Sequence, residues 1–364
     1  MTQTPVLDAD KAAAFGERIF TAALGTIDIA SIYLGDRLGL YRALADAGPS
    51  TYPELAAACS TNTRYTREWC EQQAVTGLLE VDDVAAEPDA RRYSLPPEHA
   101  DAFCDPDSGS SLAPVARALV SAFSVLPATL DAFRTGGGVP WSAFGADGIE
   151  SQGDFNRPWL RTALTQEYLP AVADLHEKLS NGARVADVAC GVGWAGITIA
   201  KDYASTTVVG LDPDDSSIAL ARRFASEDGV ADRTTFEVHD ATQPLPGGPF
   251  DFVLIVEALH DMAQPVDVLA RVRESLAPDG VVIVADERVG EHFTAPGDEV
   301  ERFMYGASVF MCLPAGMSEE PSAATGTVMR PGTLRRYATD AGFSRVEVIE
   351  QIDHPMLRFY RLFV

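Results

Sequence analysis

The hydrophobic and polar residues of this chain follow two different periods. Over residues 11–45, apolar side chains recur at steps of three and four, which is the spacing of one face of a helix. From residue 183 onward, short runs of consecutive apolar residues alternate with stretches of helical period. Continuous apolar runs are typical of parallel strands that are covered on both faces. This second pattern therefore predicts a doubly wound α/β domain.

The α/β pattern assigns its elements to definite segments. The expected strands are residues 184–189, 206–212, 234–239, 250–258 and 280–286, and the expected helices between them are residues 195–203, 215–228 and 265–277. A further helix, residues 331–341, precedes two closing apolar runs, SRVEVIEQI and LRFYRLFV. Only residues 353–356 separate these two runs. So short a connection permits an antiparallel hairpin and excludes a parallel crossover.

The N-terminal part carries the signals of a winged helix. Thr51 suits the N-cap of a helix, with Glu54 as its capping-box partner. Two short helices are expected, at about residues 52–58 and 62–76. The segments LLEVDD and RRYSLP then read as two strands of a wing with an acidic loop between them. A helix, a helix-turn-helix and a wing together make up a winged-helix module.

These patterns predict three regions. Residues 1–105 form a winged-helix and dimerisation domain, and residues 181–364 form the α/β domain. Residues 106–180 are a helical linker that contributes to the substrate pocket. Within it, the glycine- and aromatic-rich residues 136–158 are expected to form either an ordered loop near the ligand site or a surface excursion between two helices.

The charge of the chain argues against nucleic acid and membrane as partners. The net charge is −25, and a field of that sign repels phosphate backbones and anionic lipid. Residues 51–100 hold nine acids and four bases, a balance of −5, which is the wrong sign for a DNA-reading helix-turn-helix. The winged helix is therefore expected to serve packing or dimerisation.

The sequence lacks the patterns of a membrane span, a signal peptide and a cysteine metal site. No run of 18 uninterrupted apolar residues and no basic segment followed by an apolar core is present, so we expect a cytoplasmic protein without a membrane span. The five cysteines are scattered and no pair has metal-ligand spacing. We therefore expect reduced thiols and no metal site.

A glycine-rich turn marks the start of the α/β domain. The segment ARVADVACGVGWAG, residues 183–196, reads as a strand, a turn containing Gly191 and Gly193, and the start of a helix. Such a turn lets a ligand lie against bare backbone N–H groups. Gly191-Val-Gly193-Trp-Ala-Gly196 matches the dinucleotide fingerprint, and Asp212 ends the next expected strand. Taken alone, these features would suggest NAD.

Carboxylates at successive strand ends favour S-adenosylmethionine instead. Asp187 lies just before the glycine turn, where its charge would oppose a pyrophosphate but would suit an ammonium and a sulfonium. Asp212 is placed to accept both ribose hydroxyls. Asp240 ends the third expected strand, where a carboxylate can accept from the adenine amino group. Each of these acids could also be a helix N-cap or a strand-end turn residue.

The same segments resemble a known family. DVACGVG (187–193), GLD (210–212), HDA (239–241) and FDFVLIVEALHDM (250–262) are similar to motifs of the class I S-adenosylmethionine-dependent methyltransferases. With the winged helix in front, the chain resembles the two-domain small-molecule O-methyltransferases, which pair through their N-terminal modules. The resemblance implies a Rossmann-like sheet of seven strands with the last strand antiparallel, a homodimer and a small-molecule acceptor.

The resemblance also implies roles for single residues of the cofactor site. Gly191 and Gly193 would pass under the methionine portion, and Asp212 would hold the ribose. Asp240 and Ala241 would bracket the adenine.

His260 is the candidate general base. It follows the expected strand 250–258, at the edge where α/β sheets bind ligands, and a neutral imidazole can accept a proton from a hydroxyl near neutral pH. In the family, a His-Asp pair at this position supplies the base, and here the pair is His260-Asp261. The family usually has Trp next, whereas this chain has Met262. His260 could instead be a helix-entry residue with a structural hydrogen bond.

Three further features bear on the site. Asp286 and Glu287 end the fifth expected strand, and either could orient the base. Glu257 interrupts an apolar run and could face the ammonium of the cofactor, the substrate or the surface. Residues 293–330 are rich in Met and aromatic side chains and form either core or an adaptable apolar lid over the acceptor.

The leading hypothesis is methyl transfer to a hydroxyl oxygen of a small, largely apolar acceptor, such as a secondary metabolite. An N- or C-methyltransferase, or an enzyme that uses the bound cofactor without moving its methyl group, would share this frame. Two hypotheses from other classes are a winged-helix regulator with a degenerate cofactor domain and an NAD(P)-dependent oxidoreductase.

Overall fold

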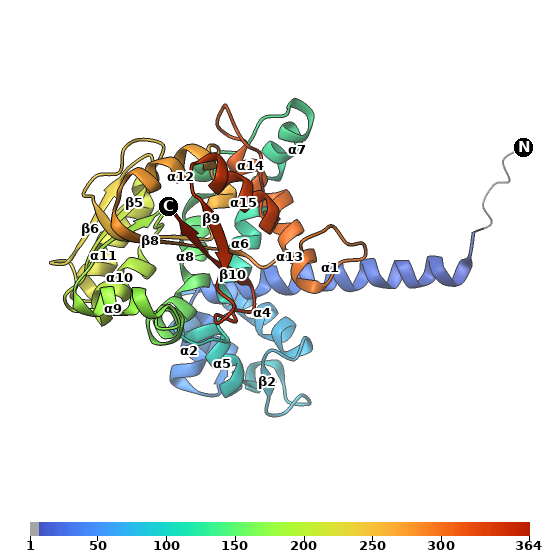
Figure 1. The fold of residues 1–364 in the computed structure, drawn as a ribbon. Coiled ribbons are helices and arrows are strands. Elements are labelled where there is room, and N and C mark those ends of the chain that lie inside the picture. The colour runs from blue at the N-terminus through green and yellow to red at the C-terminus, as the bar shows by residue number, and fades with distance from the viewer. Residues whose placement is uncertain (1–6) are drawn as a thin grey trace, which may run out of the picture. The chain divides into compact units, whose positions relative to one another are not determined.

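The structure is a computed structural model that describes residues 7–364. The chain divides into two compact units, one reaching to Val120 and one running from Ser121 to Val364. Each unit is described by itself below. Figure 1 labels the elements of both.

The first unit is a winged helix. Its helices are α1 (Ala9–Arg37), α2 (Leu40–Ala47), α3 (Tyr52–Ala58), α4 (Thr63–Val75) and α5 (Pro97–Cys104), and its strands are β1 (Ser50–Thr51), β2 (Glu80–Val81) and β3 (Arg92–Ser94). The strands form an antiparallel sheet in the order β1-β3-β2, so the predicted wing is present. The predicted capping box of Thr51 and Glu54 begins α3.

A glycine allows α1 to pack against the core of this unit. A Cβ on Gly35 would come 2.5 Å from the ring of Tyr41 and 2.6 Å from Trp69. The turn between α1 and α2 lies four residues further on, at Gly39, which has a φ of 70°. Tyr41 and Trp69 meet edge to face inside the unit, with 5.2 Å between ring centroids.

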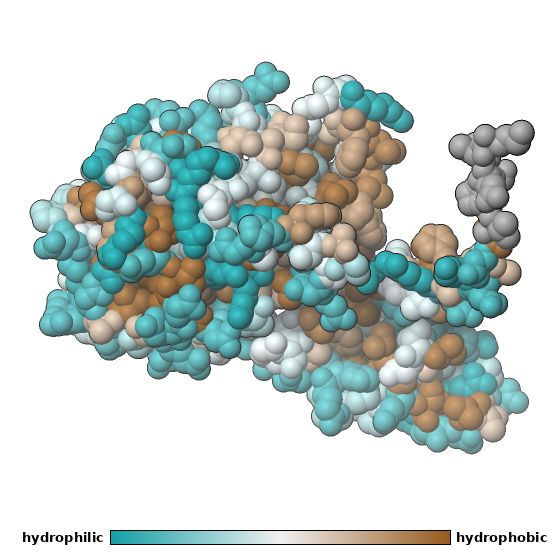
Figure 2. Space-filling view, turned by 45° about the vertical axis from the view of Figure 1, so that its right-hand side comes forward, coloured by the Kyte–Doolittle hydropathy of each residue, from teal (hydrophilic) through white to brown (hydrophobic). Residues whose placement is uncertain are grey.

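Most of α1 makes no packing contact within its own unit. Residues 7–27 are all exposed, and in Figure 1 the N-terminal half of α1 extends beyond the other helices of this unit. Its exposed apolar side chains are Phe15, Ile19, Phe20, Leu24, Ile27 and Leu34. In Figure 2 hydrophobic residues, in brown, lie among hydrophilic ones, in teal, on the segment next to the grey N-terminal residues. By length and composition alone α1 could cross a membrane, and the bent pair of α6 and α7, defined below, could count as a second span.

The second unit is built on one sheet of seven strands. They are β4 (Arg184–Val188), β5 (Thr207–Asp212), β6 (Thr234–Val238), β7 (Phe250–Val256), β8 (Leu276–Glu287), β9 (Arg345–Val348) and β10 (Leu357–Phe363). Their order is β6-β5-β4-β7-β8-β10-β9, and β10 is antiparallel to both of its neighbours. The predicted sheet with an antiparallel last strand is confirmed.

Helices cover both faces of this sheet (Figure 1). The helices of this unit are α6 (Ala113–Ser124, which begins before the unit boundary), α7 (Leu126–Thr135), α8 (Gly145–Thr162), α9 (Ala173–Asn181), α10 (Trp194–Asp202), α11 (Asp215–Glu227), α12 (Pro265–Glu274), α13 (Glu299–Ala307), α14 (Leu313–Gly316) and α15 (Pro331–Asp340). Of these, α8, α9, α10, α11, α12 and α15 contribute to the two cores on the sheet. Alternate strand residues point to two separate cores. Val185 and Leu254 pack in one, whereas Ala186 and Val253 pack in the other.

The segment rich in glycine and aromatic residues is mainly helical. Residues 136–158, expected as a loop, form a short turn, the 3₁₀ helix η2 (Trp141–Phe144) and most of α8. The expectation was wrong because two of the glycines serve close packing rather than chain flexibility. A Cβ on Gly148 would lie 2.7 Å from Phe144, and a Cβ on Gly153 would overlap Val192 of the glycine turn.

The topology brings the candidate residues to one edge of the sheet. The chain passes from β4 outward to β5 and β6, and then returns to β7 on the other side of β4. Ligands of doubly wound proteins bind at such a reversal, outside the carboxyl ends of the strands. Gly191, Asp212, Glu257 and Asp286 all lie at or just after the ends of β4, β5, β7 and β8.

Candidate cofactor and catalytic site

The predicted glycine turn between β4 and α10 is present, and its backbone is left-handed at three positions. Ala189, Gly191 and Gly193 have φ values of 57°, 52° and 84°. A Cβ on Gly193 would come 2.8 Å from the ring of Phe236, so that position needs glycine for space as well as for conformation. The turn therefore offers a bare backbone at the N-terminus of α10.

Asp187 lies beneath this turn. Its side chain is 2% exposed, and its Oδ2 accepts a hydrogen bond from the N–H of Gly196 at 2.9 Å. Burial raises the pKa of Asp187 to about 7. The carboxylate thus holds the first turn of α10 to the end of β4.

Asp212 meets the glycine turn from the end of β5. Its carboxylate accepts from the N–H groups of Gly191 and Asp214, each at 2.9 Å. Burial raises the pKa of Asp212 to about 6. The contact with Gly191 joins the two strand ends and places a partly exposed carboxylate beside the turn.

The residues that follow β6 do not bond to the glycine turn, unlike Asp187 and Asp212. Asp240 is exposed, and its carboxylate accepts from the N–H of Thr242 at 2.9 Å and from its hydroxyl at 2.8 Å. Ala241 packs at the edge of a core. The Nε2 atom of His239 is buried without a hydrogen-bond partner. This edge therefore offers an unused polar atom beside the carboxylate.

Glu257 follows β7 and faces α8. Its backbone has a φ of 45°, which is rare for a residue with a side chain. Its carboxylate accepts from Asn156, and from Gln152 Nε2 at 3.1 Å. Burial raises the pKa of Glu257. Sequence reasoning did not single out Gln152 and Asn156, although their spacing of four places both amides on one face of a helix.

His260 is deeply buried and hydrogen-bonded. It belongs to the short helix η4 (Leu259–Asp261), and its side chain is 2% exposed. Its Nδ1 lies 2.8 Å from Asp286 Oδ1, and its Nε2 lies 3.3 Å from Asp261 Oδ1. Of the two acids that could orient the imidazole, Asp286 makes the bond. Glu287 is buried next to it, and its Oε2 has no hydrogen-bond partner.

The charges around His260 decide its protonation. Burial lowers the pKa of the imidazole, but the carboxylates of Asp261 and Asp286 outweigh this effect and hold the pKa well above the ordinary value. Burial, followed by the charge of Glu257, raises the pKa of Glu287. The site is thus a buried imidazole surrounded by carboxyl groups.

Part of the segment 293–330 covers this region. Helix α14 contacts both η4 and the π-helical turn η5 (Ser308–Cys312). A Cβ on Gly316 of α14 would come 3.0 Å from the carbonyl oxygen of Asp261. Phe310 and Met311 pack against a small core that includes Val139 and Phe144. Met304 is buried, whereas Phe303 is exposed, so the segment contains both core and surface positions.

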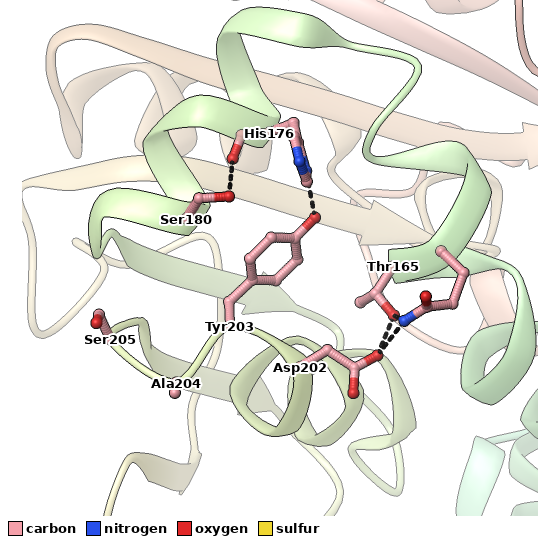
Figure 3. A pocket seen from close by; sticks show the side chains of 8 residues that line it. Thr165, His176, Ser180, Asp202, Tyr203, Ala204 and Ser205 are labelled. Atoms are coloured by element: carbon pink, nitrogen blue, oxygen red, sulfur yellow. Dashed lines mark hydrogen bonds between the residues drawn. The ribbon is translucent and has the colours of Figure 1, made fainter.

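A separate hollow of about 380 Å³ lies at the opposite edge of the sheet. In Figure 3, Tyr203 and His176 meet through a hydrogen bond of 2.9 Å, and Asp202 accepts from Thr165. These residues precede β5 or flank α9, so they lie at the amino ends of the strands. Because the polar groups bond one another, this hollow offers little to a ligand.

Comparisons with known proteins agree with this architecture. A family model described as a methyltransferase domain matches residues 179–329, and one described as an Rv2258c-like winged HTH domain matches residues 26–104. The chain is 26% identical over 185 residues to the ubiquinone biosynthesis O-methyltransferase of Pseudomonas paraeruginosa, covering 50% of this chain and 73% of that protein.

Solved structures share the fold over the whole chain. The structure of the mitomycin 7-O-methyltransferase MmcR superposes with a TM-score of 0.68 at 19% identity, over 98% of this chain and 100% of that one. Human N-acetylserotonin methyltransferase in complex with SAM superposes with a TM-score of 0.68 at 16% identity, over 100% of this chain and 99% of that one.

The burial of Asp187 generates a prediction about stability. Because its folded pKa is raised to about 7, ionisation lowers the stability of the fold as pH rises from about 4 towards 7. Asp187→Asn keeps an oxygen for Gly196 and removes this dependence, whereas Asp187→Ala leaves a buried N–H unpaired at a cost of about 1–3 kcal/mol. Urea unfolding of the three proteins at pH 5 and pH 8 measures both effects. Equal stability of the Ala and Asn variants at both pH values would contradict this role.

Proposed function

We propose that this chain, which is a class I S-adenosylmethionine-dependent methyltransferase with an N-terminal winged-helix domain, methylates a hydroxyl oxygen of a small, largely apolar acceptor, with His260 as the general base. The observation that carries the proposal is the hydrogen bond between His260 and Asp286 at the carboxyl edge of the sheet. Methyl transfer to a hydroxyl requires a bound donor, an oriented base and a pocket for the acceptor.

The residues at the strand ends fit the donor. The glycine turn provides backbone N–H groups and space for the methionine portion, and Asp212 provides a carboxylate for the ribose hydroxyls. Asp240 and Ala241 would bracket the adenine, beside the unpartnered Nε2 of His239. When bound, S-adenosylmethionine supplies a methyl group already activated on a sulfonium.

Glu257 and Asp187 would complete the cofactor site in different ways. Glu257 is fixed by the amides of Asn156 and Gln152 and would accept from the ammonium of the methionine portion. Asp187 is almost fully buried, so it would act from beneath by holding the glycine turn and adding negative charge. Both carboxylates suit a cationic ligand.

The base is oriented by its partner. A hydrogen bond from Nδ1–H to Asp286 leaves the Nε2 lone pair of neutral His260 to accept the proton of the acceptor hydroxyl. As the proton arrives, the carboxylates of Asp286 and Asp261 stabilise the imidazolium. The same carboxylates raise the pKa of His260, so a larger share of the enzyme carries a protonated and inactive base at low pH.

The apolar character of the acceptor is supported by the residues near η4. Phe310 and Met311 pack with Val139, Phe144 and Trp141 into an apolar cluster. Phe310 and Met311 belong to residues 293–330, and the other three side chains lie between α7 and α8. We propose that this cluster forms the wall of the acceptor pocket, consistent with a role in secondary metabolism.

The first prediction tests the base. His260→Ala should lower turnover by about 10²–10⁴-fold and leave affinity for S-adenosylhomocysteine intact, because general-base catalysis contributes a factor of that size. Release of S-adenosylhomocysteine is measured with a panel of simple phenols, each beside its methyl ether, which offers no hydroxyl. His176→Ala, at the opposite edge of the sheet, serves as the matched control.

The pH profile gives the same test a second readout. The rising limb of kcat/KM should lie above pH ~6.5, the ordinary histidine value, and should move to lower pH in Asp286→Asn. Full activity of His260→Ala with a phenol would make this histidine structural. Turnover with anilines but not with phenols would favour the N-methyltransferase alternative.

The second prediction tests the ribose contact. Asp212→Ala should weaken binding of S-adenosylhomocysteine by about 1–3 kcal/mol, because charge-assisted hydrogen bonds are lost. Isothermal titration calorimetry measures the change, with Asp215→Ala, an exposed acid three residues on, as the control. An unchanged Kd would remove Asp212 from the site. The same titration with NAD should give no heat.

The third prediction concerns the homodimer. Stable monomers rarely expose so many large apolar side chains along one helix, so we propose that α1 packs against a second copy of the chain. Light scattering after size exclusion, without detergent, should give about twice the chain mass of 39.0 kDa. Leu24→Glu with Ile27→Glu should shift the protein towards the monomer, whereas Arg18→Glu should not. A wild-type monomer would refute the dimer.

A further inference from the structure

The proposed base His260 also belongs to a cluster of three ligand-type side chains. His260, Asp261 and Cys312 each offer one ligand-type atom, and these three atoms lie within 4.8 Å of one another. His260 and Asp261 belong to η4, and Cys312 ends the π-helical turn η5. The spacing of about 50 residues between them explains why the cysteine pattern in the sequence did not reveal this group.

Several polar atoms in and around this group lack hydrogen bonds. Asp261 Oδ1 is buried without a hydrogen bond, although it lies 3.3 Å from His260 Nε2. Outside the group, the neighbouring atoms Asp286 Oδ2 and Glu287 Oε2 are also buried without hydrogen-bond partners, on side chains that are 1% and 5% exposed. Asp286 Oδ1 already orients the imidazole through Nδ1, so this orientation does not require Asp261. Unpaired buried carboxylate oxygens are costly unless a ligand pairs with them.

We propose that His260, Asp261 and Cys312 bind a divalent transition-metal ion of the zinc class. An imidazole nitrogen, a thiolate and a carboxylate are the ligands that such ions prefer, whereas Mg²⁺ and Ca²⁺ prefer oxygen ligands alone. Three protein ligands leave one position of a tetrahedral ion open. All three ligands belong to this chain, and binding of the ion does not depend on the proposed methyl transfer.

The surroundings of His260 match those of a metal-binding histidine. Such a histidine usually donates its other ring N–H to a carboxylate, which fixes the ring and its tautomer. Here Nδ1 is paired with Asp286 at 2.8 Å, so Nε2 is the atom that faces Asp261 and Cys312. Burial raises the pKa of Glu257 and Glu287 nearby, and a bound dication would favour their ionised forms.

The proposed site has a consequence for the reaction, and this part rests on the proposed function. A metal ion on Nε2 occupies the lone pair that would accept the proton of the acceptor. Binding of the ion should therefore block methyl transfer rather than assist it. The ion would act as an inhibitor at the base, without displacing the cofactor from the glycine turn.

Cobalt provides a direct readout of the ligands. Metal-free full-length protein titrated with Co²⁺ should develop a thiolate-to-cobalt charge-transfer absorption that saturates at one ion per chain and is removed by Zn²⁺. Cys312→Ala should lose this absorption and bind Co²⁺ at least about tenfold more weakly. Cys190→Ala, which removes another thiol close to buried carboxylates, should keep it. Circular dichroism checks that both variants are folded.

The outcomes separate this proposal from the methyltransfer mechanism. No charge-transfer band in the wild type, or a band that survives in Cys312→Ala, overturns the metal site whatever the activity. A band that depends on Cys312, with S-adenosylhomocysteine release inhibited by micromolar Zn²⁺ but not by Mg²⁺, supports both the site and its effect. Cobalt binding with unchanged turnover would keep the site and overturn its action on the base.

Discussion

The register between β7 and β8 is the constraint on which the candidate site depends. Val256 pairs with Ala285, so the residues that follow these two positions share one edge of the sheet. That pairing brings Asp286 within 2.8 Å of His260, although 26 residues separate them. A shift of one residue would turn Asp286 to the other face of the sheet and leave the imidazole without its partner. The function we propose therefore relies on strand pairing deep in the core.

The same edge concentrates charge that a stable core would avoid. Asp187, Glu257, Asp286 and Glu287 are buried or nearly so, and burial raises the pKa of three of them. Backbone N–H groups and amide side chains satisfy some of their oxygens, as Gly196 does for Asp187. A bound cationic donor would favour the ionised forms of these acids, and so would a metal ion near Cys312. Strained backbone at Ala189 and Glu257 accompanies this arrangement, as is common at functional sites.

Sequence patterns predicted the strands of the sheet, but they misassigned one helical segment and missed the side chains that it contributes to the site. The apolar runs located β4, β5, β7 and β8, which are buried on both faces over most of their length, whereas the edge strand β6 is buried only at Phe236. The misassigned segment was 136–158, where glycines that permit close packing at Gly148 and Gly153 were interpreted as loop glycines. The amides of Gln152 and Asn156 were missed for the same reason, because their common face exists only if α8 is a helix. The choice between Asp286 and Glu287 stayed open because adjacent residues on a strand differ only in the face to which they point.

The sequence by itself determined the local features of this protein: the strands, the left-handed glycine turn, the capping box of α3 and the carboxylates that end successive strands. Those features depend on residues close together in the chain, where period and backbone preference act. The tertiary structure alone decided which acid meets His260, that α8 supplies amides to Glu257, and that Cys312 lies beside the imidazole. Those contacts join segments far apart in the chain, and only strand register and the packing of helices on the sheet set them.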